Sequence, residues 1–416
     1  MKQIITCLLF SLAFSLFTKA QTVKTEPLVE DVHSLQVNAG GDWKQLPIIT
    51  LNTDQFIQIN FDRLGENAST TLRYRIVYCN ADWTRSPLAE IEYISGFNNV
   101  LIDDYAHSVN TTVEYTNFIV NIPNERIKLK YAGNYVVEVY EDTNKSTTLL
   151  TACFSVVDPQ ISMTASVSSN TMIDSNKEHQ QISFSINTNN LQIRDAFSDL
   201  KVYVHQNNRV DNQKSLIKPT SIQGTKLVYE YNRDLIFEAG NEYRRFEIVS
   251  HRYNGLNVES VSYFNPNYLA NILPDKLKSG KNYSYDRDQN GRFVIRNAEV
   301  NDSNIGADYF VTTFRLLTTT PFIEPIYLNG GFSYGKFNDT YLMTYDANKN
   351  EYSTSILLKQ GAYNYQYLAK SGNKYTTSLT EGNYFETENE YCIMVYYRPW
   401  GQRTDLLAGT LLISNK

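Results

Sequence analysis

The sequence of 416 residues has little cysteine, and its cysteines lie far apart. Cys7 falls within an apolar leader, which leaves Cys79, Cys153 and Cys392. Three thiols cannot all pair, so the chain is not a small disulfide-stapled scaffold. A Cys79–Cys153 bridge is one interpretation. We favour buried unpaired thiols, because a chain of this length can bury enough apolar surface without covalent cross-links.

Clustered charge is also missing. The formal net charge is −6, and neither basic nor acidic residues gather into runs. Because a nucleic-acid-binding protein needs a basic patch or stripe, the sequence argues against a nucleic-acid partner. Beyond the leader, no apolar run is long enough to cross a membrane as a helix. We expect no direct membrane span.

The leader itself resembles an export signal. Lys2 precedes an apolar run from Ile4 to Phe17, and Thr18-Lys19-Ala20 follows. A basic start, a short apolar core and a small final residue are typical of a secretory signal peptide, here residues 1–20. With so few cysteines in an exported chain, we expect a periplasmic location.

Motifs for catalysis or metal binding are scarce. Phosphate loops, dinucleotide fingerprints and nucleophile elbows are absent from the sequence. Asp103 and Asp104 form an adjacent acid pair, but neighbouring residues on a strand point to opposite faces. The histidines show no paired spacing that would suggest zinc: His33, His107, His179, His205 and His251. We therefore expect no enzyme activity, cofactor or metal.

One segment could be taken for a calcium loop. Asp286-Arg287-Asp288-Gln289-Asn290-Gly291 copies the alternating oxygen ligands and the glycine of such a loop, but the position of the bidentate glutamate holds Asn297. Asn-Gly between two strand-like segments is also a strong hairpin signal. We predict a hairpin turn, with calcium binding as the alternative.

The sequence is rich in aromatic residues, with 31 Tyr and 20 Phe, which favours β-strands. Short segments place apolar residues at every second position, the period of a half-buried strand. In the N-terminal third these segments are Gln55–Phe61, Leu72–Val77, Asn117–Ile122, Asn134–Tyr140 and Leu149–Val157. Turn residues separate them, as in an immunoglobulin-type β-sandwich.

The same pattern continues to the C-terminus and predicts an all-β chain of three immunoglobulin-like sandwiches in series. Asp158-Pro159 and Thr318-Thr319-Thr320-Pro321 interrupt it and suggest boundaries. We predict domains at residues 21–158, 159–318 and 319–416. The second contains a long surface connection near residues 264–290, and the third is an immunoglobulin-like sandwich of the early-set type.

The third predicted domain allows a second functional hypothesis. Its aromatic alternation resembles the immunoglobulin-like modules beside starch-active enzymes, whose exposed rings stack on sugars. The candidate glycan contacts are Phe337, Tyr365, Tyr367 and Trp400. The alternative function is thus a secreted glycan-binding protein with a starch-binding-like C-terminal domain. Under the structural interpretation, these rings simply fill the sandwich core.

Several strings in the N-terminal third carry a more specific resemblance. The most distinctive is Tyr78-Cys79-Asn80-Ala81-Asp82-Trp83. Others are Phe61-Asp62, Glu92-Tyr93-Ile94-Ser95-Gly96-Phe97, Ile102-Asp103-Asp104-Tyr105, Tyr115-Thr116-Asn117 and Gly133-Asn134-Tyr135. The chain resembles the type IX secretion system plug family of Bacteroidetes, most densely over residues 35–160. Tyr78 and Asn117 depart from the family, where His is usual.

The resemblance implies a non-enzymatic periplasmic protein that closes the periplasmic opening of a large outer-membrane β-barrel translocon. Such a protein needs a surface that binds the barrel. We predict that the loop from Asn80 to Asn110 supplies it, because this loop is aromatic and lacks clear alternation. Its candidate contacts are Trp83, Tyr93, Phe97, Asp103, Asp104 and Tyr105. Under the alternative interpretation, these aromatic side chains fold back onto the first sandwich.

Overall fold

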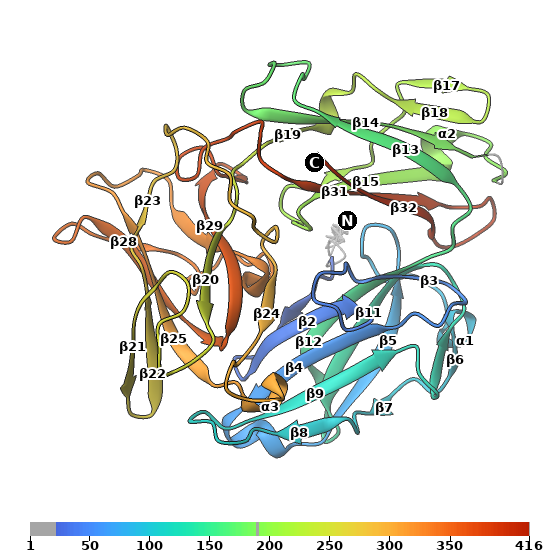
Figure 1. Cartoon of the computed structure of the whole chain (residues 1–416). Helices are drawn as coiled ribbons and strands as arrows, with labels where there is room; N and C mark the ends of the chain where they lie inside the picture. Colours follow the sequence, from blue (N-terminus) through green and yellow to red (C-terminus); the bar gives the residue numbers. More distant parts are fainter. Residues whose placement is uncertain (1–21, 189–190, 416) are drawn as a thin grey trace, which may run out of the picture.

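The computed structural model describes residues 22–188 and 191–415, so the predicted signal peptide lies outside the described residues. Strands account for 48% of the structure and helices for 6%, which confirms the all-β class. The strands form several separate sheets (Figure 1). The strands predicted in the N-terminal third are present.

The first packing unit, residues 22–158, is a sandwich around one apolar core. One sheet contains β1 (Glu26–Pro27), β12 (Asn144–Val157), β11 (Gly133–Glu141), β5 (Leu72–Cys79), β7 (Val100–Leu101) and β3 (Ile48–Thr50). The other contains β2 (Val32–Ala39), β4 (Ile57–Leu64), β9 (Tyr115–Ile122) and β8 (Tyr105–His107). At the rim lie β6 (Ile94–Gly96), β10 (Ile127–Leu129), α1 (Glu90–Tyr93) and the 3-10 turn η1 (Gly65–Ser69).

The second unit combines residues 159–239 with residues 388–415. Its first sheet contains β13 (Ser162–Ser168), β14 (His179–Asn187), β18 (Lys226–Tyr229), β17 (Ser221–Gln223) and β19 (Ile236–Glu238). Its second sheet contains β16 (Lys214–Ser215), β15 (Leu200–Gln206), β31 (Glu390–Tyr397) and β32 (Leu406–Ser414). Two short turns, α2 (Ala196–Asp199) and η2 (Arg233–Leu235), complete it. The last strands of the chain therefore close a sandwich whose first strand, β13, begins 228 residues before β31.

The inserted unit, residues 240–387, lies between these two halves in sequence. One sheet contains β20 (Arg244–Ile248), β29 (Gly361–Ser371), β24 (Phe293–Ile295), β26 (Ile326–Asn329) and β30 (Lys374–Thr376). The other contains β21 (Val258–Phe264), β22 (Asn267–Ile272), β25 (Tyr309–Leu317), β28 (Glu351–Lys359), β27 (Thr344–Asp346) and β23 (Asp275–Lys276). Two short turns are α3 (Ser303–Gly306) and η3 (Gly331–Ser333).

These pairings bear on the division of the chain. β25 and β28 pair along their whole length although residue 318 lies between them, and β15 pairs with β31 across the inserted unit. Separate apolar cores support the grouping. We therefore propose three units, the second of them discontinuous. The stretch at 264–290, predicted as a long connection, contains β22 and β23 before it runs irregularly to β24.

Each unit contacts the other two. Figure 1 shows the first unit in blue to teal, the second in green and dark red, and the inserted unit in yellow to orange-red. Asp405 accepts a hydrogen bond from the backbone of Ala81, and Lys359 pairs with Asp62. Arg292 pairs with Glu390. The chain thus closes into one three-sided body.

Candidate partner-binding surface

The Tyr78–Trp83 string forms a tight turn at the end of β5. The backbone N–H of Trp83 donates to the carbonyl oxygen of Asn80 at 3.0 Å, and Trp83 has a φ of 62°. The turn faces the second unit. The Ala81 N–H donates to Asp405 Oδ2 at 3.0 Å, and the Tyr78 hydroxyl lies 2.8 Å from the Asp405 carbonyl oxygen. We call these contacts the Tyr78 junction.

Two further residues of the strings complete this junction. Gly133 has a φ of 142°, and a Cβ there would lie 2.1 Å from the Tyr78 hydroxyl. Only glycine lets Tyr78 reach the Ala132 carbonyl oxygen, at 2.6 Å. Asn134 is fully buried, and its side-chain oxygen accepts hydrogen bonds from Ser155 and from Tyr396 of the second unit. Tyr78, Gly133 and Asn134 therefore support contacts between parts of this chain.

Asp405 is the charged group of the Tyr78 junction and is 1% exposed. Burial raises the pKa of this carboxyl, but hydrogen bonds from Arg398 and Lys201 outweigh it and hold the pKa below its usual value. Arg398 Nε lies 2.8 Å and Lys201 Nζ 2.9 Å from the carboxylate oxygens. The charge is therefore compensated from within the second unit.

Two predicted contact residues lie inside the fold. Tyr93 is 4% exposed; its ring packs against Tyr78 and Tyr135, and its hydroxyl donates to the Ile76 carbonyl oxygen. Trp83 is half-buried beside the cluster of Cys79, Val136 and Cys153. Tyr93 is therefore a core residue. Trp83 offers at most one side of its ring to a partner.

The three cysteines of the described part of the chain are buried and unpaired. Cys79 lies on β5 and Cys153 on β12, and the strand β11 runs between them. Burial raises the pKa of Cys79 to about 12 and raises that of Cys153 as well. Both thiols therefore stay protonated and unreactive near neutral pH.

The other predicted contacts are exposed. Phe97 is 82% exposed and Tyr105 is 54% exposed. Asp103 and Asp104 also face solvent, and Asp103 pairs with Arg126 at 2.5 Å. Tyr105 lies on β8, with its ring centroid 5.8 Å from that of Phe118. Their exposure leaves all four available to a partner.

A broader surface extends from Phe97 onto the second unit. Ile91 on α1 is 80% exposed, Trp400 in the β31–β32 loop is 77% exposed, and Tyr131 is 39% exposed. We call Ile91, Phe97, Tyr131 and Trp400 the α1 surface. An ion pair between Glu92 and Arg403 joins α1 to that loop. The pair holds α1, which bears Ile91, against the loop that bears Trp400.

Charged groups are interspersed on the α1 surface. Lys130 Nζ donates to the Ile91 carbonyl oxygen at 2.7 Å, and the Arg194 guanidinium lies 4.4 Å from the Trp400 ring centroid. Aromatic groups with arginine and a polar rim are typical of protein–protein interfaces. Ile91 and Tyr131 were not predicted as contacts, because single apolar residues between charges also occur on ordinary surfaces.

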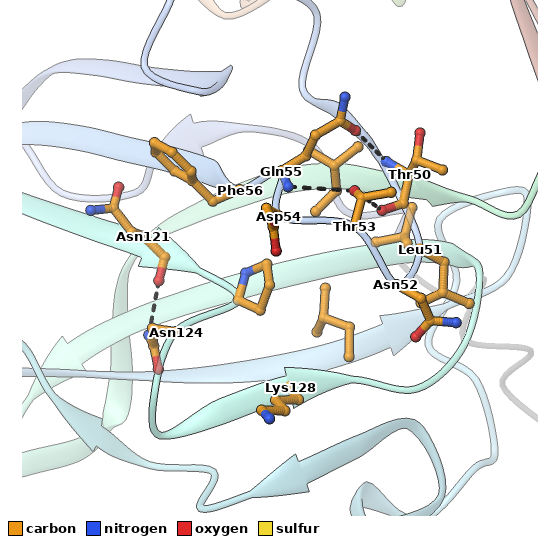
Figure 2. Close-up of a pocket in the computed structure, with 14 residues that line it drawn as sticks. Thr50, Leu51, Asn52, Thr53, Asp54, Gln55, Phe56, Asn121, Asn124 and Lys128 are labelled. Carbon is orange, nitrogen blue, oxygen red and sulfur yellow. Dashed lines mark hydrogen bonds between the residues drawn. The ribbon is translucent and has the colours of Figure 1, made fainter.

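Two hollows open on the first unit. The larger, of about 500 Å³, lies between the β3–β4 loop and the turn at Pro123 and Asn124 (Figure 2). Its loop folds back on β3: Thr50 N–H donates to Gln55 Oε1, and Thr53 Oγ1 donates to the Thr50 carbonyl oxygen, each at 2.7 Å. The sheet edge here is thus capped by the chain itself, so no partner strand can add to it.

The second hollow, of about 420 Å³, lies beside α1 and the Tyr78 string. Arg75 and Arg85 line it, and both bind the buried carboxylate of Glu138. The guanidinium groups are therefore already paired. This hollow adjoins the α1 surface but offers no unpaired charge to a ligand.

The glycan candidates do not share a face. Tyr365 and Tyr367 are 1% and 0% exposed, and their hydroxyls donate to Asp275 Oδ2 at 2.8 and 2.7 Å. The Phe337 ring stacks on Tyr375, with centroids 3.4 Å apart. Trp400 lies on the second unit. Two of the four rings are therefore core residues, because β29 is buried on both faces.

The candidate calcium segment forms the predicted turn. The Arg292 N–H donates to the Gln289 carbonyl oxygen at 3.1 Å, and Asn290 and Gly291 have positive φ. Residues 283–285 do not form a strand and β24 pairs with β29, so the turn is present but the predicted hairpin is wrong. Asp286 pairs with Arg245, whereas Asp288 accepts the Asn290 N–H.

These two carboxylates are therefore engaged with different partners. Burial raises the pKa of Asp288 to about 7. Within residues 22–188 and 191–415, no three or more His, Cys, Asp or Glu side chains gather as metal ligands.

The fold and its exposed groups define an all-β protein suited to contacts with another macromolecule. Residues 32–158 match the family model of the type 9 secretion system plug protein, first domain. The chain belongs to the type IX secretion system plug family.

A solved structure resembles almost the whole chain. It is described as a hypothetical protein from Parabacteroides merdae ATCC 43184, and it is 42% identical with a TM-score of 0.92. The match covers 95% of this chain and 100% of that one. No curated protein matches. Across the described residues, no helix has the length and apolarity needed to cross a bilayer.

Proposed function

We propose that this protein is a non-enzymatic periplasmic plug that binds and closes the periplasmic opening of the outer-membrane translocon barrel of the type IX secretion system. The family suggests a role in type IX secretion, and it implies a periplasmic or outer-membrane-associated location. The observation that carries the proposal is the family match in the first unit, which is joined to the other two units through buried contacts.

The shape of the body supports this role. A stopper must obstruct a wide opening without deforming, and three sandwiches in mutual contact present a broader body than three domains on flexible linkers. The α1 surface supplies a contact for the barrel. Phe97 is part of this surface, and Asp103, Asp104 and Tyr105 stay predicted contacts in addition to it. An interface of roughly 1,200–2,000 Å² would hold the plug and still permit release.

Affinity isolation of the tagged protein from envelope membranes tests this proposal. The wild-type protein should recover a very large outer-membrane barrel. The double variant Ile91→Glu with Phe97→Ser should recover at least tenfold less, because both side chains are exposed anchors in the proposed interface. Ile323→Ser, at a side chain that is 97% exposed on the inserted unit, is the matched control and should recover the barrel normally.

Two outcomes would contradict the proposal. One is equal recovery of the barrel by the wild-type and double-variant proteins, both folded. The other is a deletion strain whose outer membrane is no more permeable to large solutes than the parent. Retention of the protein on polysaccharide without any barrel would support the glycan-binding alternative instead.

A further inference from the structure

A second exposed apolar region lies on the inserted unit, at the hairpin of β21 and β22. Asn265 and Pro266 form the turn of this hairpin, which appears at the lower left of Figure 1. Phe264, next to the turn, is 74% exposed, and Tyr263 is 54% exposed. Tyr268 on the opposite strand packs on Phe310 and anchors the hairpin to its sheet.

The hairpin carries no charge. From Ser260 to Pro274 the sequence contains no Asp, Glu, Lys, Arg or His. The nearest charged residues at either end are neutralised: Glu259 pairs with Arg315, and Asp275 pairs with Arg244. The exposed residues next to the turn are Ser262–Phe264. An exposed edge free of charge is unusual, since edge strands commonly carry lysine or another charge that prevents association.

The outer strand is also uncapped. β21 pairs with β22 alone, and within the described structure the backbone of Ser260–Phe264 bonds to no other segment. This contrasts with the β3 edge, where Gln55 and Thr53 cap the backbone. The outward N–H and C=O groups of β21 therefore need hydrogen-bond partners, which water or the headgroups of a lipid layer can supply.

The two exposed surfaces differ in the chemistry they offer. The α1 surface mixes aromatic residues with Glu92, Lys130 and Arg403, as a protein interface does. The hairpin offers a phenyl ring and a phenol with no charge. Tyrosine and other aromatic side chains favour the bilayer–water interface, where one end is apolar and headgroups and water satisfy polar groups.

We propose that the β21–β22 hairpin docks on a lipid bilayer turn-first, so that Phe264 and Tyr263, which are adjacent on β21 and point to opposite faces of the hairpin, both reach the boundary between headgroups and acyl chains. The contact does not depend on the plug function. Because the hairpin lacks lysine and arginine, it gains nothing from anionic lipid. Its affinity is low, since even a single acyl chain gives only marginal membrane binding. The hairpin therefore acts as a second attachment beside a protein contact.

Vesicle flotation with the purified full chain tests the inference. Binding to phosphatidylcholine vesicles at millimolar lipid should be measurable, and it should not change when a third of the lipid is phosphatidylglycerol or when salt is raised. Phe264→Ser should weaken binding roughly tenfold, because the variant has no phenyl ring to transfer from water into the bilayer interface. Ile323→Ser, equally apolar and exposed but distant in sequence, should bind as the wild type does.

A fluorescence measurement locates the contact. In Phe264→Trp, bromine-labelled lipids should quench the added emission, relative to the wild-type background from Trp43, Trp83 and Trp400. Absence of both flotation and quenching overturns the inference, as does binding that requires phosphatidylglycerol and disappears with salt. If Phe264→Ser instead loses the translocon barrel while vesicle binding is unchanged, the hairpin docks in a protein pocket and the bilayer proposal is wrong.

Discussion

The first unit meets its two neighbours through junctions of different chemistry. At the Tyr78 junction the buried charge, Asp405, has both of its cations on its own unit, and only neutral groups of the first unit reach across. At the other junction Asp62 of β4 faces Lys359 of β28, at 0% and 1% side-chain exposure. Here the two charges belong to different units. We call this the Asp62 junction.

The residues around Asp62 make it more than one ion pair. The Tyr309 hydroxyl donates to Asp62 Oδ2 at 2.6 Å, and Asn117 Nδ2 donates to Oδ1 at 2.7 Å. Lys359 also lies 4.0 Å from the Tyr115 ring centroid. Burial lowers the pKa of Lys359, although Asp62 opposes this effect. Both oxygens of the carboxylate therefore have hydrogen-bond partners: Tyr309 and Lys359 at Oδ2, and Asn117 at Oδ1.

The first unit is thus joined to one neighbour by an ion pair that crosses the boundary, and to the other by a carboxylate whose cations lie on its own side. A buried pair adds little net stability over an apolar substitute, but removal of one partner leaves an uncompensated buried charge. The Asp62 junction should therefore tolerate single changes worst. At the Tyr78 junction, neutral groups of the first unit bond to Asp405, whose charge is compensated within its own unit, and Leu407 and Met394 add apolar packing. This junction should therefore lose stability in smaller steps.

The largest effect is expected at Lys359. Lys359→Met leaves Asp62 buried without its cation and should cost about 3–5 kcal/mol of unfolding free energy. Denaturant unfolding of the full chain measures this loss. Hydrogen exchange should also rise at residues 304–309, where the inserted unit contacts the first.

Two controls separate the buried charge from other causes. Asp62→Asn combined with Lys359→Met removes both charges but keeps an acceptor for Tyr309, so it should recover most of the loss. Lys336→Met breaks a half-buried pair with Glu26 between the same two units, at 3.4 Å, together with a hydrogen bond to the Pro27 carbonyl oxygen, and should cost about 1–2 kcal/mol. A double variant as unstable as the single one would refute the explanation.

The sequence predicted strands better than it predicted their partners. The alternation at Leu72–Val77 and Asn134–Tyr140 is realised in β5 and β11, because one face of each pair must be buried. Alternation does not encode the partner strand, so the pairing of β15 with β31 was not foreseen. It also cannot mark a strand buried on both faces, so Tyr365 and Tyr367 on β29 were candidate exposed rings under the glycan-binding alternative, and the core interpretation holds for both.

The exposure of the candidate contact residues was predicted only in part. Phe97 and Tyr105 are exposed as expected, but Tyr93, close to both in sequence, is buried. The strings that carry the family resemblance also lie at the junctions: Asp62 and Asn117 at one, Tyr78 and Asn134 at the other. Contacts between distant units leave no periodic signal in one sequence, so residues that join units can be mistaken for residues that bind partners.

A smaller effect is expected at Asp405, and it depends on pH. Asp405→Asn should cost about 1.5–3 kcal/mol at neutral pH, because hydrogen bonds to a charged carboxylate are lost. The pKa of Asp405 in the folded protein lies below its unfolded value near 3.8. This stabilisation is therefore fully present above that value and is lost as the pH falls through the folded pKa.

Unfolding free energies of the wild type and Asp405→Asn, measured from pH 7 to pH 2, should thus converge at the acid end. Asp339→Asn changes an exposed carboxylate and serves as the control. A constant difference across this range would mean that the charge of Asp405 contributes nothing to the Tyr78 junction.

The smallest effect separates contacts across the Tyr78 junction from contacts within the first unit. Tyr78→Phe removes the hydroxyl beside Ala132 and Asp405 and should cost about 1 kcal/mol. Tyr93→Phe removes a bond of similar kind to Ile76, entirely inside the first unit. Both variants should lower stability, but only Tyr78→Phe should increase hydrogen exchange at residues 404–407. Equal exchange in the two variants would show that Tyr78 stabilises its own sandwich alone, and that the apolar cluster around Leu407 holds the two units together.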